Sequence, residues 1–387
     1  MRRAAAIGFD FDKIIDRRHT TCEKWDKYAG TDVIPMWVAD MDFQSPPPVM
    51  DALRRHIEHG IFGYQCDPQP ELVEVVLAML KSRYDWEVEA DWLIWIPGLV
   101  TGLNLACRAT GEEDDEVISL VPIYPPFLSA PRFARRRLVA VDLCCSEGRW
   151  LIDFEALEKS ITPHTRLLLL CNPHNPVGRV FRRDELLRLC EVCLGHDIVI
   201  CSDEIHCDLI LDDLAHIPTA TLSPAIAERT ITLMAPSKTY NIPGLGSSVA
   251  IISNPKLRRM FWRAKRGVVP HINTLGFTAA LAAWRDGEPW REALLDYLRE
   301  NRNLVTAFVN DQLPGLSMTH VEATYLAWIN AQGLELADPE AFFETAGVGL
   351  SGGAHFQGNG YLRLNFGCPR PLLQKALNRM KNALDSR

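Results

Sequence analysis

The stretch TITLMAPSKTYNIPGLGSSVAII, residues 230–252, places a single lysine between two short apolar runs. The runs TITLM (230–234) and SVAII (248–252) are typical of strands that are buried on both faces of a mainly parallel sheet. Lys238 follows the first run, although a lysine is seldom buried without a partner. The stretch therefore predicts a strand, a loop and a second strand, with an ammonium group at the end of the first strand.

Four more runs have the same character. Helical patterns lie between several of them, for example over residues 98–110 and 182–195. This alternation predicts an α/β fold in which helices cover both faces of the sheet. The four runs are WLIWI (92–96), VISLV (117–121), LLLLC (167–171) and IVICS (198–202).

The pattern changes from about residue 288, where a long amphipathic helix precedes the run ATYLAWIN, a helix near 338–346, the strand YLRLNF and a last helix. These elements predict a smaller α+β domain. The N-terminal segment is expected to join it, because chain termini often meet at one edge of a domain. The prolines of SPPP (45–48) mark the boundary. We thus expect a large domain over 48–287 and a small domain made of 1–47 with 288–387.

Composition and charge exclude several classes of protein. With 47% hydrophobic residues and a net charge of −8 over 387 residues, the chain resembles an ordinary enzyme without the basic field of a nucleic-acid-binding protein. The basic runs at 132–137 and 256–266 are expected to be solvated helix faces. No apolar run approaches the ~18 residues of a membrane span, and MRRAAAIGFDFDK lacks the apolar core of a signal peptide.

The cysteines favour a reducing environment and no metal site. Cys190 and Cys193 form a lone C-x-x-C in a helical pattern, without the second pair that a zinc site needs. Most of the eleven cysteines are expected to be reduced, buried side chains of a cytoplasmic protein.

Three polar residues follow predicted strands and are expected to face one crevice. Asn175, Asp203 and Lys238 all lie at carboxyl ends of strands, where open α/β sheets bind their ligands. Together they suit a pyridine aldehyde. Lys238 would form a Schiff base and move the substrate's Cα proton, Asp203 would keep the ring nitrogen protonated, and Asn175 would donate to the ring oxygen. A buried lysine paired with a carboxylate is the structural alternative.

A phosphate cradle and a stacking residue complete this interpretation. Gly98 opens a helix directly after a strand, so the N–H groups of Gly98, Leu99 and Val100 could hold an anion. Alone, this glycine would indicate only a strand–helix turn. Tyr124 also follows a strand and could stack on a ring, or simply pack in the core.

The order of Gly98-Leu99-Val100, Tyr124, Asn175, Asp203, Ser237-Lys238 and Arg363 resembles the fold-type I pyridoxal 5'-phosphate (PLP) enzymes, the aspartate aminotransferase superfamily. The segments 11–28 and 33–43 look more specifically like the carbon–sulfur β-lyase branch, which includes cystathionine β-lyases and a maltose-regulon repressor. The resemblance implies a large domain with a mainly parallel seven-stranded sheet, a smaller α+β domain, and PLP as the cofactor.

The resemblance also implies roles for individual residues. Lys238 matches the Schiff-base lysine, and Asp203, Asn175 and Tyr124 match the groups around the ring. Arg363 matches the arginine that binds the substrate carboxylate through two parallel hydrogen bonds. Tyr64 would reach the phosphate of a neighbouring subunit in a homodimer. Trp37 would line the substrate pocket, and so would Asn175.

Three positions depart from the pattern of many aminotransferases. Gly246 stands where they carry a phosphate-binding arginine, and Ala235 where they often have a serine. His206 replaces a tyrosine against the ring oxygen, and could contact the cofactor or lie behind it. The phosphate is then expected to depend on backbone amides, on Ser237 or Thr239, and on the partner's Tyr64.

Three functions remain open from the sequence. The first is β-elimination on cysteine S-conjugates, giving pyruvate, ammonia and a thiol. The second is an aminotransferase, which would need a second specificity cation for a dicarboxylate substrate. The third is regulatory binding of a transcription activator. We also predict cis peptide bonds at Asn175–Pro176 and Val121–Pro122, where the crevice wall must turn.

Overall fold

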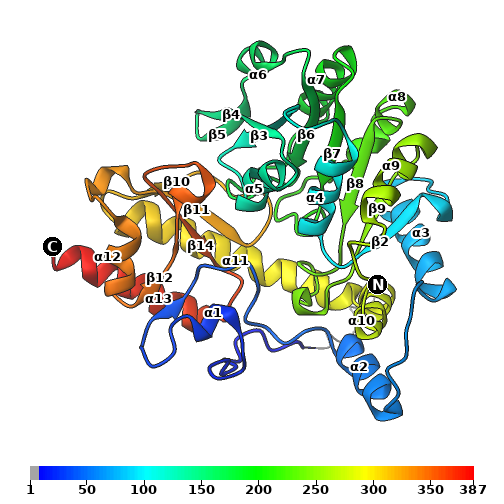
Figure 1. Cartoon of the computed structure of the whole chain (residues 1–387). Coiled ribbons are helices and arrows are strands. Elements are labelled where there is room, and N and C mark those ends of the chain that lie inside the picture. Colours follow the sequence, from blue (N-terminus) through cyan, green and yellow to red (C-terminus); the bar gives the residue numbers. More distant parts are fainter. Residues whose placement is uncertain (1–7) are drawn as a thin grey trace, which may run out of the picture.

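The computed structural model describes residues 8–387, which form three sheets and the helices around them (Figure 1). The strands are β1 (Ile34–Pro35), β2 (Leu93–Ile96), β3 (Glu116–Val121), β4 (Arg137–Ser146), β5 (Arg149–Ile152), β6 (Thr165–Cys171), β7 (Val199–Asp203), β8 (Thr230–Met234), β9 (Ser248–Ile251), β10 (Ser317–Met318), β11 (Leu326–Asn330), β12 (Val348–Gly349), β13 (Ser351–Gly352) and β14 (Tyr361–Asn365). The helices are α1 (Glu23–Asp26), α2 (Pro47–His59), α3 (Pro70–Tyr84), α4 (Leu99–Ala109), α5 (Pro125–Phe133), α6 (Phe154–Ser160), α7 (Arg183–Gly195), α8 (Pro224–Ala227), α9 (Pro255–Lys265), α10 (Thr274–Asp286), α11 (Glu288–Gln312), α12 (Pro339–Thr345) and α13 (Arg370–Asp385).

The largest sheet has the strand order β2-β9-β8-β7-β6-β3-β4-β5. Strands β8, β7, β6, β3 and β4 are parallel to one another, whereas β9 and β5 run antiparallel to their neighbours. All six apolar runs form strands of this sheet, so the predicted α/β fold is confirmed. The expected number of seven strands is wrong, because the sheet has eight.

The hairpin of β4 and β5 at the edge of the sheet was not predicted from the apolar runs. β4 has several exposed residues, so it does not form the continuous apolar run of a central strand. The two strands are joined by Glu147 and Gly148, which both have positive φ angles, as a tight hairpin turn requires. The hairpin therefore extends the sheet at an edge that the solvent reaches.

Helices cover both faces of the large sheet, and alternate strand residues decide which face they meet. Leu167 and Leu169 of β6 pack with α4, α5 and α9, whereas Leu168 and Leu170 pack with α6, α7 and α8. Each face of the sheet thus has its own apolar core, and the predicted three-layer arrangement is confirmed. Cys190 and Cys193 are buried free thiols of α7 in one of these cores.

One of the two basic runs does not form the expected solvated helix face. Helix α5 ends at Phe133, and Arg136 is buried, donating hydrogen bonds to the carbonyls of Cys107 and Asp115. Its guanidinium satisfies backbone groups that would otherwise be buried without partners. The run at 256–266 lies in α9 as predicted, although Lys265 is buried.

The C-terminal elements form a second body beside the large sheet (Figure 1). Its antiparallel sheet has the order β10-β11-β14-β13. The N-terminal segment joins this second body because β1 and β12 form a separate, parallel two-stranded sheet. These pairings support the proposed division at 48–287 against 1–47 with 288–387. Residues 1–7, which belong to the N-terminal MRRAAAIGFDFDK stretch, lie outside the described residues. Within residues 8–387, no helix has the length and apolar character to span a membrane.

Candidate active site

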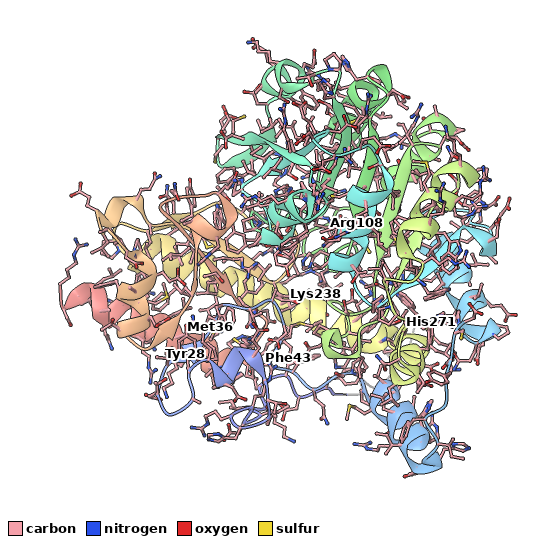
Figure 2. The ribbon with its side chains drawn as sticks, in the orientation of Figure 1. Tyr28, Met36, Phe43, Arg108, Lys238 and His271 are labelled. Atoms are coloured by element: carbon pink, nitrogen blue, oxygen red, sulfur yellow. The ribbon has the colours of Figure 1, made fainter. Side chains whose placement is uncertain are left out.

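A cavity of about 350 Å³ lies at the carboxyl ends of the central strands. This volume is within the usual range for small-molecule sites. Figure 2 shows Lys238 near the centre of the molecule, between the large sheet and the N-terminal segment that carries Met36 and Phe43. The cavity is lined by Ala39, Pro97, Gly98, Leu99, Val100, Thr101, Tyr124, Phe127, Cys171, Asn175, Asp203, Ile205, His206, Ser237, Lys238 and Pro243.

Strand ends bring the predicted residues together. Asp203 is the last residue of β7, while Tyr124, Asn175 and Lys238 lie in the turns that follow β3, β6 and β8. The peptide bonds Val121–Pro122 and Asn175–Pro176 are cis, which confirms both predictions, and Asn172–Pro173 is a third cis bond that was not predicted.

Lys238 has no carboxylate partner in the described structure. Its Nζ donates a hydrogen bond to the carbonyl oxygen of Ala39 in the N-terminal segment. Burial lowers the pKa of the Lys238 amine to about 8, and Arg363 adds to this lowering, while Asp40 and Asp203 oppose it. A substantial fraction of a free amine at this position is therefore neutral near physiological pH, as a base must be.

Asp203 is buried at the floor of the cavity. Burial raises the pKa of its carboxyl to about 7, against an ordinary value of 3.8, although the backbone N–H of Ile205 donates to it over 3.1 Å and Lys238 lies near. Because burial disfavours the charged form of this carboxyl, its carboxylate is suited to a cationic ligand atom, such as a protonated ring nitrogen.

Asn175 and His206 offer hydrogen-bonding atoms beside Tyr124. The backbone N–H of Tyr124 donates to the backbone carbonyl of Asn175 over 3.1 Å, which joins the turn after β3 to the turn after β6. Burial lowers the pKa of His206 to about 3, so its imidazole is neutral, and its Nδ1 has no hydrogen-bond partner in the described structure. His206 lines the cavity, which favours a direct contact with a bound ligand over a position behind it.

Arg363 of β14 is a buried cation without a carboxylate partner among residues 8–387. Nη1 donates to Oδ1 of Asn175 over 3.1 Å, Nη2 donates to the carbonyl of Trp37 over 2.8 Å, and Nε has no partner. Burial lowers its pKa to about 10, still high enough to keep the guanidinium charged. Because a buried charge is costly unless it is paired, this arrangement indicates a site for an anionic group of a ligand.

The other end of the cavity has the character of an anion cradle. Gly98 caps α4, and the first N–H groups of this helix have no partners within it. A side chain at Gly98 would project into open space, because no atom lies within 4 Å of the position that its Cβ would occupy. Ser237 also lines the cavity, whereas Thr239 is buried nearby with an unpartnered hydroxyl.

Three predicted residues, Tyr64, Trp37 and Arg363, are not among the residues that line this cavity. Arg363 adjoins it through Asn175, a lining residue whose Oδ1 accepts a hydrogen bond from Nη1. Tyr64 lies on a fully exposed loop of its own chain. The indole of Trp37 donates to the carbonyl of Lys24 over 3.0 Å, and its ring lies beside the ammonium of Lys27. The backbone of Trp37, not its side chain, therefore contacts Arg363.

The segment 37–43 was expected to line the substrate pocket through Trp37, but the hydrogen bonds of its backbone carbonyls were not predicted. The carbonyls of this segment accept hydrogen bonds from Lys238 and Arg363, and from Asn241, Tyr325 and Asn365. Contacts between a side chain and a distant backbone carbonyl carry no local sequence signal. Only the similarity of VIPMWVADMDF to a known branch indicated that the segment mattered.

Comparison with known proteins places this site in a family. The profile of the family described as aminotransferase class I and II matches residues 31–380. The chain belongs to this family. Cystathionine beta-lyase PatB of Bacillus subtilis (strain 168) is 38% identical over 386 residues, covering 97% of this chain and all of that protein.

Solved structures of relatives share the whole fold. The crystal structure of OvoB is 48% identical, with a TM-score of 0.95, and covers 98% of this chain and 100% of that chain. The PLP-bound C-S lyase from Staphylococcus hominis is 34% identical, with a TM-score of 0.92, and the match covers 98% of this chain and 99% of that chain. The chain therefore has the fold-type I architecture over nearly its full length.

PLP is the cofactor of this family, and the cavity fits it. Lys238 would provide a partly neutral amine for the aldehyde, Asp203 would provide a carboxylate for the ring nitrogen, and the start of α4 would provide a cradle for the phosphate. Tyr124 and the unpartnered Nδ1 of His206 border the same space. The residues present at this cavity therefore fit PLP.

Proposed function

We propose that this protein is a PLP-dependent carbon–sulfur β-lyase that converts L-cysteine S-conjugates, such as cystathionine, into pyruvate, ammonia and a thiol. The observation that carries the proposal is the buried, uncompensated Arg363 in the same site as Lys238, because it suits the carboxylate of an amino acid. Relatives that are named as cystathionine beta-lyase or C-S lyase support elimination as the reaction.

The chain's own residues bind and orient the substrate. Arg363 binds the α-carboxylate, and Asn175, which Arg363 contacts, fixes the direction of the guanidinium. PLP, when bound, supplies an aldehyde that joins to amines and a ring that delocalises negative charge. Lys238, as a neutral amine, takes the Cα proton, and a good leaving group then departs from Cβ as a thiolate.

The lining of the cavity favours elimination over transamination of a dicarboxylate. Among the described residues that line it, Lys238 is the only Lys or Arg. A second carboxylate of a substrate such as aspartate would therefore find no Lys or Arg besides Lys238 among the described lining residues. Transamination also requires Lys238 to deliver a proton a second time, which expulsion of a stabilised thiolate does not require.

The proposal includes a homodimer in the cytoplasm. Tyr64 is fully exposed beside the exposed apolar residues Ile61 and Phe62, so this loop is suited to a contact with a second copy of the chain. In that dimer, Tyr64 would serve the phosphate of the partner's site. All eleven cysteines are free thiols, which supports a reducing compartment.

Product analysis tests the reaction. The holoenzyme should release pyruvate, ammonia and free thiol in equal amounts from L-cystathionine and S-ethyl-L-cysteine, without any keto acid. Lys238→Ala should abolish this turnover, and borohydride followed by peptide mapping should place the pyridoxyl label on Lys238 in the wild type. A requirement for a keto acid, with no thiol released, would replace the lyase by an aminotransferase.

A further inference from the structure

Tyr325 contributes a buried hydroxyl to the same carbonyl that holds the catalytic lysine. Its hydroxyl donates to the carbonyl oxygen of Ala39 over 2.9 Å, and Nζ of Lys238 donates to the same oxygen. The tyrosine is 1% exposed and precedes β11. A carbonyl oxygen has two lone pairs, so Tyr325 and Lys238 together use its acceptor capacity.

Hydrogen bonds from two asparagine side chains hold the segment around the Ala39 peptide. Nδ2 of Asn365 donates to the carbonyls of Val38 and Asp40, each over 2.6 Å. Nδ2 of Asn241 donates to the carbonyls of Met41 and Phe43. Within residues 8–387, Tyr325 is the side chain besides Lys238 that donates to the Ala39 oxygen itself, so the asparagines hold the segment and Tyr325 sets the direction of this carbonyl.

We propose that Tyr325 is a positioning residue for Lys238. By holding the Ala39 carbonyl, Tyr325 directs the amine of Lys238 toward the Cα atom of the substrate. An amine that donates an N–H to a fixed carbonyl has its lone pair directed elsewhere, here toward the cavity that Lys238 lines. When Lys238 takes the proton, the ammonium keeps the same acceptor. This inference rests on the proposed function only in that Lys238 moves the Cα proton.

The surroundings of Tyr325 favour a role as a hydrogen-bond donor over a role as a base. Burial raises the pKa of its phenol well above the ordinary value of 10, so it remains a protonated donor. Its ring packs edge-on against His206, with 6.1 Å between the ring centroids. The ring is thereby held beside the site, and the hydroxyl is free to serve the carbonyl alone.

Hydrogen exchange at Cα measures proton transfer by Lys238 without any elimination. We would follow deuterium incorporation into L-alanine, which has no leaving group at Cβ, by NMR with the holoenzyme. Tyr325→Phe should slow exchange about 10- to 100-fold, the loss expected when a reacting group is misplaced. The affinity for L-alanine, from a spectral titration, should stay within about twofold, because Arg363 is unchanged.

Tyr28→Phe is the matched control. Tyr28 is also buried, and its replacement by Phe removes a hydrogen bond of 2.7 Å to Glu344. Within residues 8–387, the Tyr28 hydroxyl makes no hydrogen bond to the segment 37–43. The control should exchange at the wild-type rate. Three results would each overturn the proposal: exchange in Tyr325→Phe within about twofold of the wild type, an equal loss of exchange in the control, or a parallel loss of alanine affinity in Tyr325→Phe.

Capture of PLP by the apoenzyme gives a readout without substrate. The pH dependence of the capture rate reports the neutral fraction of the Lys238 amine. In Tyr325→Phe the ammonium no longer shares its acceptor, so the profile should move to higher pH, and an unmoved profile would contradict the proposal.

If Tyr325→Phe fails to fold, 4-aminophenylalanine at position 325 keeps a donor and should retain most of the exchange; loss of exchange in that folded variant would refute the assignment. Exchange with alanine in a protein that cleaves no S-conjugate would refute the lyase and leave this inference standing.

Discussion

Asp203 shows how one buried residue can oppose the stability of the apoprotein and still serve the proposed function. Its pKa of about 7 in the folded state lies above the ordinary 3.8. Between about pH 4 and pH 7 the folded apoprotein therefore binds a proton that the unfolded chain has lost, and its stability falls as the pH rises. With PLP bound, a protonated ring nitrogen would compensate the carboxylate.

Asp203→Asn should consequently stabilise the apoprotein and weaken cofactor binding. The expected gain in the free energy of unfolding is on the order of 2–4 kcal/mol at pH 8, and it should vanish at pH 4. Denaturant unfolding at both pH values measures it, with the exposed Asp213→Asn as a control. Equal stability of Asp203→Asn and the wild type at pH 8 would contradict this account, as would undiminished retention of PLP by the variant on dialysis.

At the scale of elements, the loop between β8 and β9 explains the missing phosphate-binding arginine. Gly246 has a φ of +55°, and a Cβ there would lie 2.9 Å from the carbonyl oxygen of Pro97, which precedes the cradle at Gly98. A side chain at 246 would thus be strained and would push on the turn that leads into α4. The loop brings its backbone, not a cation, close to this end of the cavity.

Gly246→Ala should therefore destabilise the protein by about 1–2 kcal/mol. Gly244→Ala is the matched control two residues away, because its φ is not positive and no atom lies within 4 Å of its Cβ position. Thermal unfolding of the two variants compares them directly. A midpoint for Gly246→Ala equal to that of Gly244→Ala would show that the loop relaxes without cost.

How far the sequence predicts each element depends on how local its signal is. The six apolar strands and the turns after them follow from short patterns, and these place Asn175, Asp203 and Lys238 in one cavity. The β4–β5 hairpin was missed because β4 is partly exposed. The contacts of Tyr325 and Asn365 with the segment 37–43 span about 290–330 residues and exist only after the whole chain has folded.

At the scale of the whole molecule, the site joins distant parts of one chain. Lys238 comes from the large sheet, Arg363 from the antiparallel sheet and Ala39 from the N-terminal segment. A change in how these bodies pack would separate Lys238 from Arg363, the base and the carboxylate-binding group of the proposed function. The cavity lining includes residues of the large sheet and of the N-terminal segment, but neither Tyr64 nor any other residue of its loop.

The last prediction concerns that loop and a second copy of the chain. Because Ala235 and Gly246 provide no side-chain ligand for a phosphate, a hydroxyl from the partner's Tyr64 should matter more than usual. Tyr64→Phe should weaken PLP retention about 10-fold, the effect of one lost hydrogen bond to a charged group, without lowering the unfolding midpoint of the apoprotein. Equilibrium dialysis measures the first quantity and calorimetry the second.

Mixed dimers distinguish an action of Tyr64 on the partner's site from an effect of Tyr64 within its own subunit. A heterodimer of Lys238→Ala and Tyr64→Phe chains has one subunit that keeps Lys238 and would receive the partner's native Tyr64. That site should bind PLP as tightly as the wild type, whereas the Tyr64→Phe homodimer should not. An active monomer by light scattering, or a heterodimer whose Lys238 site binds as weakly as the Tyr64→Phe homodimer, would show that Tyr64 does not act across an interface.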